Sequence, residues 1–143
     1  MRVDFYQLSR DPAEAAVAAI AAKALAGGKR MLVVAQDEAL LSRVSDALWA
    51  VKESFLANGY AGGPHDARQP VLLSDQLEAA NGADILALAD GKWREAPGFD
   101  RVLLFFDNST IDDARAQWRA LRGREDAECH YWSQAEGRWQ EKG

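Results

Sequence analysis

The residues with the most chemical potential lie in one segment, residues 110–124, whose letters are TIDDARAQWRALRGR. At about 100° per residue, a helix over this segment places Arg115, Trp118 and Arg122 within a sector of roughly 60°. Arg119 lies just beyond that sector. The residues expected to face the core are Ala114 and Leu121. Trp118 is therefore predicted to lie where the buried side of the helix meets a row of guanidinium groups.

This arrangement suits a ligand that carries both carboxylates and a hydrophobic group. A guanidinium presents a fixed fork of N–H donors that matches a carboxylate, and an indole offers a large apolar surface beside it. A row of arginines is also typical of a helix face that contacts only water. Both interpretations fit the helix geometry.

The overall composition limits the classes of protein to which this chain can belong. Its 143 residues, of which 48% are hydrophobic, are enough for one domain with one substantial core. The net charge of −5 argues against a broad nucleic-acid-binding surface, which has to be basic. Cys129 is the only cysteine, so an intramolecular disulfide and a thiolate metal cluster are excluded. The charged N-terminal residues and the lack of a long apolar run predict a cytoplasmic protein without a membrane span.

Short β-rich runs alternate with helical patterns along the chain. The expected strands are residues 3–8, 31–35, 71–73, 85–89, 101–106 and 129–133. The expected helices are residues 13–26, a second helix that Asp37 caps, and residues 110–124. Pro12 is expected at the first helical position after a cap formed by residues 9–11, and residues 53–70 are expected to form a long connection. The alternation predicts a single α/β domain over residues 1–143, with a mostly parallel sheet and helices on both faces.

No catalytic or cofactor-binding set is evident in the sequence. An α/β sheet invites a search for a glycine-rich phosphate loop, but neither the dinucleotide-binding nor the P-loop pattern occurs. His65 and His130 are far apart in the chain, and neither has a second metal ligand at a recognisable spacing. Cys129 is interpreted as a small core residue, and Asp107 as a turn and cap residue. The sequence therefore predicts no cofactor, no metal and no catalytic residue.

The second helix carries a tryptophan on its outer side. Trp49 shares that side with Ser42 and Ser45 and points away from the apolar stripe. An exposed tryptophan is costly unless something covers it. Either the following segment, which contains Phe55 and Leu56, folds back over Trp49, or these side chains form an apolar docking patch for a partner.

Six short stretches, in order along nearly the whole chain, match a known family. They are Asp4-Phe5-Tyr6-Gln7-Leu8, Gly28-Lys29-Arg30-Met31-Leu32-Val33, Asp46-Ala47-Leu48-Trp49, Ser54-Phe55-Leu56, Pro70-Val71-Leu72-Leu73 and Ala114-Arg115-Ala116-Gln117-Trp118-Arg119-Ala120. The set is fairly specific, although each piece alone is a weak signal. With these stretches the chain resembles the chi subunit of bacterial DNA polymerase III holoenzyme, a small accessory protein of the clamp-loader complex.

The resemblance implies a Rossmann-like fold, no catalytic activity of its own and two protein partners. Chi-like proteins hold the acidic, phenylalanine-terminated C-terminal tail of single-stranded DNA-binding protein and link that protein to the clamp loader. The positions that match this tail site are Arg115, Trp118, Arg119 and Arg122. The family also binds a second small subunit, psi, through an apolar surface. The matching position is Phe55, with Trp49 and Leu56 nearby.

The chain departs from the family pattern in two places. Residues 57–60 read ANGY, where a proline–histidine–asparagine–leucine-like run is common. Ile111 stands where some relatives carry a basic residue one turn before Arg115. The tail site is therefore expected to have fewer charges here, and the identity of the second partner is open.

Two other functions remain as alternatives. The first is a nucleotide-binding or nucleotide-processing enzyme that uses Ser9 and Asp107 at the edge of the sheet. The second is a direct binder of single-stranded nucleic acid, with Trp118 as a stacking platform between arginines. The net acidity of the chain predicts little direct binding of nucleic acid.

Overall fold

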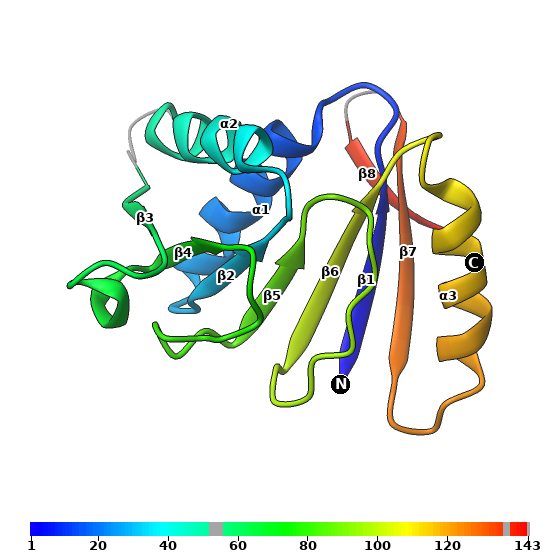
Figure 1. Cartoon of the computed structure of the whole chain (residues 1–143). Helices are drawn as coiled ribbons and strands as arrows, with labels where there is room; N and C mark the ends of the chain where they lie inside the picture. The colour runs from blue at the N-terminus through cyan, green and yellow to red at the C-terminus, as the bar shows by residue number, and fades with distance from the viewer. Residues whose placement is uncertain (52–55, 136–137, 143) are drawn as a thin grey trace.

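The described strands form one mixed sheet, shown in Figure 1. The structure is a computed structural model that describes residues 1–51, 56–135 and 138–142. The strands are β1 (Arg2–Gln7), β2 (Met31–Val34), β3 (Asn58–Tyr60), β4 (Val71–Ser74), β5 (Ile85–Leu88), β6 (Arg101–Phe106), β7 (Glu128–Ala135) and β8 (Arg138–Lys142). Their order across the sheet is β3-β4-β2-β5-β6-β1-β7-β8, and every neighbouring pair is parallel except β7 and β8. The predicted α/β class with a mostly parallel sheet is confirmed.

Helices cover both faces of the sheet, as the sequence predicts. The helices are α1 (Ala13–Ala26), α2 (Glu38–Trp49) and α3 (Ile111–Arg122), with a short 3-10 turn at Asp66–Arg68. α1 and α2 pack on one face, and α3 packs on the other (Figure 1). Trp93, Ala96 and Phe99 of the connection between β5 and β6 cover the rest of the α3 face. Within the described ranges the longest helix has 14 residues, and none combines the length and hydrophobicity needed to cross a membrane.

Strand β1 shows how the two faces are divided. Val3 and Phe5 point into the cluster beneath α3, and Tyr6 points into the cluster beneath α1 and α2. This alternation follows from the period of two along a strand. β2 and β5 are instead apolar throughout, and β4 is apolar except for Ser74. All three strands are buried on both sides, as is typical of central parallel strands.

Strands β3 and β8 are not among the strands expected from the sequence. β3 has three residues, one of them a glycine, and lies within residues 53–70, which were expected to be a connection. β8 reads RWQEK and is mostly exposed, so it lacks the hydrophobic pattern of a strand. Both are edge strands. The backbone of β3 pairs with β4 and that of β8 pairs with β7, and side-chain patterns do not reveal such pairing.

The start of α1 differs from the prediction. α1 begins at Ala13, and Pro12 occupies the cap position without any side-chain hydrogen bond to the helix. The expected cap by residues 9–11 is therefore wrong. The backbone amides of those residues instead point at Gln134 of β7, whose side-chain oxygen accepts from them at 3.1–3.4 Å. The cap of α2 is confirmed, since the Asp37 carboxylate accepts from the next-but-one amide at 2.9 Å.

Candidate functional site

The turn before α3 is held by a local hydrogen-bond network. The Asp107 carboxylate accepts from the Ser109 amide at 2.9 Å and from the Ser109 hydroxyl at 2.6 Å. The hydroxyl bond is the largest cause of the lowered pKa of Asp107. Both the bonds and the pKa shift belong to a turn that starts a helix, and the predicted structural role of Asp107 is confirmed.

The charge along α3 favours the helix. Asp112 and Asp113 lie in the first turn, and Arg119 and Arg122 lie in the last. Acidic groups at the N-terminus and basic groups at the C-terminus both interact favourably with the helix dipole. Arg119 and Arg122 can therefore stabilise the C-terminal end of α3 through the helix dipole, without ion pairs to acidic side chains.

Trp118 lies at the edge of the buried side of α3, as predicted. Ala114 and Leu121 are almost fully buried beneath the helix, whereas Trp118 is half-buried. Its ring stands edge-on to Phe5, with ring centroids 5.2 Å apart, and edge-on to Tyr131, at 5.6 Å. These contacts hold the indole in one orientation while part of it stays at the surface.

The three predicted arginines of α3 remain available for a ligand. Arg115, Arg119 and Arg122 are exposed, and in the described part of the chain they form no ion pair and no side-chain hydrogen bond. The Arg122 guanidinium carbon lies 5.2 Å from the centre of the Trp118 ring, so a cation–π contact places one charge over the indole. The structure thus brings together all four residues of the predicted site on one side of α3.

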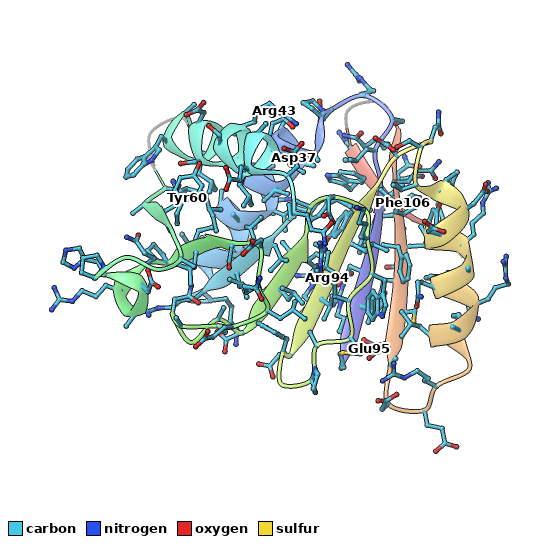
Figure 2. All side chains as sticks on the ribbon, in the orientation of Figure 1. Asp37, Arg43, Tyr60, Arg94, Glu95 and Phe106 are labelled. Carbon is cyan, nitrogen blue, oxygen red and sulfur yellow. The ribbon has the colours of Figure 1, made fainter. Side chains whose placement is uncertain are left out.

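Arg124 differs from these three arginines. It lies beyond the end of α3, and its guanidinium pairs with Glu95 at 2.9 Å and with Asp126 at 2.8 Å. Glu95 comes from the connection that crosses the α3 face of the sheet, where it is labelled in Figure 2. The positive charge of Arg124 is therefore already neutralised within the protein.

Strand β7 adds residues to this site that the sequence does not reveal. Burial raises the pKa of Tyr131, and nearby Arg115 opposes that rise. Burial likewise raises the pKa of Cys129, and Arg122 is the first of the groups that oppose it. Two arginines of α3 thus lie near β7, and the site is a surface shared by helix and strand. Only the alternation along residues 129–133 could have indicated that Tyr131 faces α3.

Three chemical features meet at this surface. It offers three guanidiniums that form no ion pair within the described residues, an indole held between two aromatic rings, and the Tyr131 ring. The Tyr131 hydroxyl donates to Gln7 at 2.5 Å. Guanidiniums bind carboxylates, and the rings can pack against an apolar or aromatic group. Within the described ranges, no three residues of the types that ligate metals gather closely enough to hold an ion.

The second predicted surface, near the end of α2, is only partly as expected. Trp49 is 48% exposed and Tyr60 is 50% exposed. Leu56 is a core residue with 8% exposure, and its amide donates to the Leu48 carbonyl at 3.0 Å. The prediction that Leu56 belongs to a docking surface is therefore wrong, because its side chain packs in the core beneath α1 and α2. Phe55 lies outside the described residues.

This second surface is far from α3. Figure 2 shows Tyr60 beyond α2, on the opposite side of the view from α3. The Asn58 side chain fixes the chain there, accepting from the Ser45 hydroxyl at 2.6 Å and donating to the Leu56 carbonyl at 2.9 Å. The two predicted surfaces are therefore separate parts of the molecule.

The carboxyl ends of the parallel strands form a cavity of about 880 Å³ where an α/β enzyme would bind a nucleotide. Its lining includes the carboxylates of Asp11, Asp37, Asp90 and Asp107. The three amides after β1, which could otherwise bind a phosphate, are occupied by the Gln134 side chain. An acidic cavity with occupied amides is unfavourable for a phosphate, so the geometry does not favour the nucleotide-enzyme alternative.

Comparison with known proteins places this chain among replication proteins. Residues 1–127 match the family described as DNA polymerase III chi subunit, HolC. The chain belongs to this family. It is also 31% identical over 130 residues to the DNA polymerase III subunit chi of Escherichia coli (strain K12), an alignment that covers 82% of this chain and 88% of the relative.

The match to the chi family includes the whole of α3. The four predicted site residues therefore lie within the part of the chain that is related to the family. β7 begins at Glu128, so both β7 and β8 lie after the matched residues. The chi family assigns the chain to DNA polymerase III and to DNA replication.

Proposed function

We propose that this chi-family protein is a non-catalytic adaptor that holds the acidic C-terminal tail of single-stranded DNA-binding protein on α3. The observation that carries the proposal is the set of three guanidiniums around a half-buried indole, none of which forms an ion pair with another described residue. Arginines without partners in a protein of net charge −5 attract a negatively charged chain end and lose little by binding it.

Each part of such a tail has a counterpart on the α3 surface. A terminal carboxylate would accept two parallel N–H bonds from one guanidinium. The other guanidiniums would contact acidic side chains upstream. The final phenyl ring would pack on Trp118 and Tyr131, whose own rings stand edge-on to each other at 85°. The proposal therefore assigns tail binding to Arg115, Trp118, Arg119 and Arg122, with Tyr131 as an added contact.

The same proposal gives the protein a second contact on the other side of the molecule. Trp49 would dock against psi or another clamp-loader protein, so that the chain connects the replicase to the single-stranded DNA-binding protein. Phe55 belongs to this surface by resemblance to the family. The exposure of Trp49 supports this second contact. Trp49 is 48% exposed, and tryptophans are frequent anchors in protein interfaces.

Calorimetric titration with an acidic peptide that ends in phenylalanine tests the α3 site. Arg119→Ala and Trp118→Ala are each expected to weaken peptide binding by about 1–3 kcal/mol, because each removes a contact in a small interface. Binding should also weaken as salt is added, since the contacts are largely between charges.

The matched control is Arg68→Ala. Arg68 is exposed and lies in the 3-10 turn, on a different part of the molecule from α3. The substitution Arg68→Ala changes the net charge by the same amount as Arg119→Ala. Any loss of peptide affinity beyond that of the control therefore reports the α3 surface. Equal affinity of the wild-type protein and both α3 variants would reject the proposal, provided that the variants keep the wild-type melting temperature.

A further inference from the structure

A buried carboxylate lies on the opposite face of the sheet from α3. The side chain of Asp4 has no exposed surface. It accepts hydrogen bonds from Arg2, from Arg101 at 2.6 Å and from the Trp132 indole at 2.8 Å. The side chains of Arg2 and Arg101 keep 40% and 29% of their surface exposed, so the far sides of these guanidiniums face outward.

A cavity of about 750 Å³ lies above this network. It is bounded by the C-terminal end of α1, the start of β1 and β6, and the pair β7–β8. Its cationic lining residues are Arg2, Lys23, Lys29, Arg101 and Arg138. No acidic residue of the described chain lines it, and the nearby Glu128 and Glu141 bind His130 at 3.1 and 2.9 Å. Asp4 neutralises one of the five charges, so the cavity is strongly positive in an otherwise acidic protein.

Aromatic rings form the apolar side of the cavity. Phe105, Tyr6 and Trp132 are in register on β6, β1 and β7, and their rings are nearly parallel, with centroids 5.1 and 6.2 Å apart. Trp139 of β8 stands edge-on to Tyr6 at 5.1 Å. Tyr6 is buried between its neighbours, whereas Trp132 and Trp139 are only partly buried and line the cavity beside its cations.

Donors in the cavity remain available for an anion. Arg2 and Arg101 use Nε and Nη2 for Asp4 and Tyr6, and Nη1 of each has no acceptor in the described part of the chain. The carbonyls at the end of α1, which would repel an anion, already accept from the amides of Gly28 and Lys29 at 3.0 Å. The cavity therefore presents donors and aromatic rings with little opposing negative charge.

We infer that this cavity binds one nucleotide unit, with its phosphate on the guanidiniums and its base against the tryptophans. Arginine forks match phosphate geometry, and aromatic side chains stack on bases of any sequence. The volume is within the range of sites for small ligands, which suits one unit rather than a long tract. A local cluster is enough for one phosphate, so the net charge of −5 does not oppose it as it opposes a broad surface.

The test uses the indole N–H signals of the full-length protein in two-dimensional NMR spectra at low salt. The probes are thymidine monophosphate and a short oligothymidylate. Both are expected to shift the signals of Trp132 and Trp139 and to leave that of Trp118 in place. Equal affinity for the two probes would identify a free nucleotide as the ligand, and tighter binding of the oligonucleotide would identify a single strand.

Two variants and a control assign the binding to the cavity. The double variant Lys29→Ala/Arg138→Ala and the single variant Trp139→Ala should each weaken binding by about tenfold, the first through lost charge and the second through lost stacking. The control Arg43→Ala/Arg68→Ala removes two exposed cations elsewhere and should change the affinity much less. Because the charge variant leaves Trp139 in place, an unfolded Trp139→Ala would not prevent the test.

Three results would overturn the inference. The first is that neither probe shifts the two indole signals. The second is that the control double variant weakens binding as much as the cavity double variant. The third is that inorganic phosphate, or an acidic peptide ending in phenylalanine, shifts these signals at least as strongly as the nucleotides do. The first two results do not bear on peptide binding at α3. In the third, the Trp118 signal shows whether the peptide also binds at α3.

Discussion

Replacing Asp4 by asparagine tests whether the buried carboxylate stabilises the fold. The substitution keeps the shape of the side chain but puts an N–H₂ group where one oxygen accepts. Oδ2 of Asp4 accepts from Arg101 at 2.6 Å, and Oδ1 accepts from Trp132 at 2.8 Å. In either orientation of the asparagine amide, its N–H₂ group lies opposite the N–H donor of Arg101 or of Trp132, and that hydrogen bond is lost.

The expected loss follows from these contacts. Removing one partner of a buried ion pair costs about 3–5 kcal/mol when both partners are buried. Here the two guanidiniums stay partly exposed to water, so about 2–4 kcal/mol is expected. For a domain of this size, that corresponds to a fall in Tm of about 5–15 °C. The control is Asp75→Asn, which changes an exposed carboxylate and should leave Tm within about 2 °C of the wild type.

The pH dependence of stability checks the same reasoning. Burial is the largest influence on the pKa of Asp4 and raises it, but the hydrogen bonds from Arg101, Arg2 and Trp132 together outweigh burial, so the pKa lies below its ordinary value of 3.8. The stability that the carboxylate contributes is therefore present above that value and is lost as pH falls through the folded-state pKa.

Urea unfolding across this pH range measures the contribution directly. The difference in free energy of unfolding between wild type and Asp4→Asn should be constant near neutral pH and shrink in acid. A difference below about 1 kcal/mol at pH 7 would show that the Asp4 network contributes little net stability. A difference that does not shrink in acid would show that the stability does not come from the ionised carboxylate.

The remaining predictions concern two glycines in loops and the exposed tryptophan at the end of α2. Gly91→Ala should destabilise the protein by about 2–4 kcal/mol, because its φ is +74° and a Cβ there would lie 2.6 Å from the Thr110 hydroxyl oxygen at the start of α3. Gly62→Ala, at φ +98° with nothing within 4 Å, should cost only about 1–2 kcal/mol by urea unfolding, and equal losses would refute the role of the contact. Trp49→Ala should leave both Tm and peptide affinity unchanged while weakening capture of a clamp-loader partner by about 2 kcal/mol or more, and unchanged capture would remove this surface from the proposal.

Local periodicity was sufficient to predict much of the fold and the main features of the α3 site. The strands and helices with a strong apolar pattern are all present, and helix geometry placed Trp118 at the edge of the core beside Arg115 and Arg122. The weak points were short or polar edge strands. β3 and β8 are held by backbone pairing rather than by a buried face, so their side chains carry little signal.

The burial of Leu56 was also beyond the sequence. An apolar residue next to an exposed tryptophan fits a docking patch as well as it fits a core. Its position is held by hydrogen bonds from the Asn58 side chain to the Leu56 carbonyl and from the Leu56 amide to the Leu48 carbonyl near the end of α2. Similarly, the sequence does not show whether Asp4 in the first strand faces water or binds Arg2 and Arg101.

The sequence by itself determined the family, the alternation of strands and helices, and the row of arginines beside Trp118. Only the tertiary structure placed Tyr131 next to that row, joined Asp4 to Arg101 and Trp132, and gathered five cations around one cavity. The reason is physical: side-chain periodicity records which face of an element is buried, over a few residues. Which elements share that face depends on the order of strands in the sheet, which brings Asp4 next to Arg101, 97 positions away.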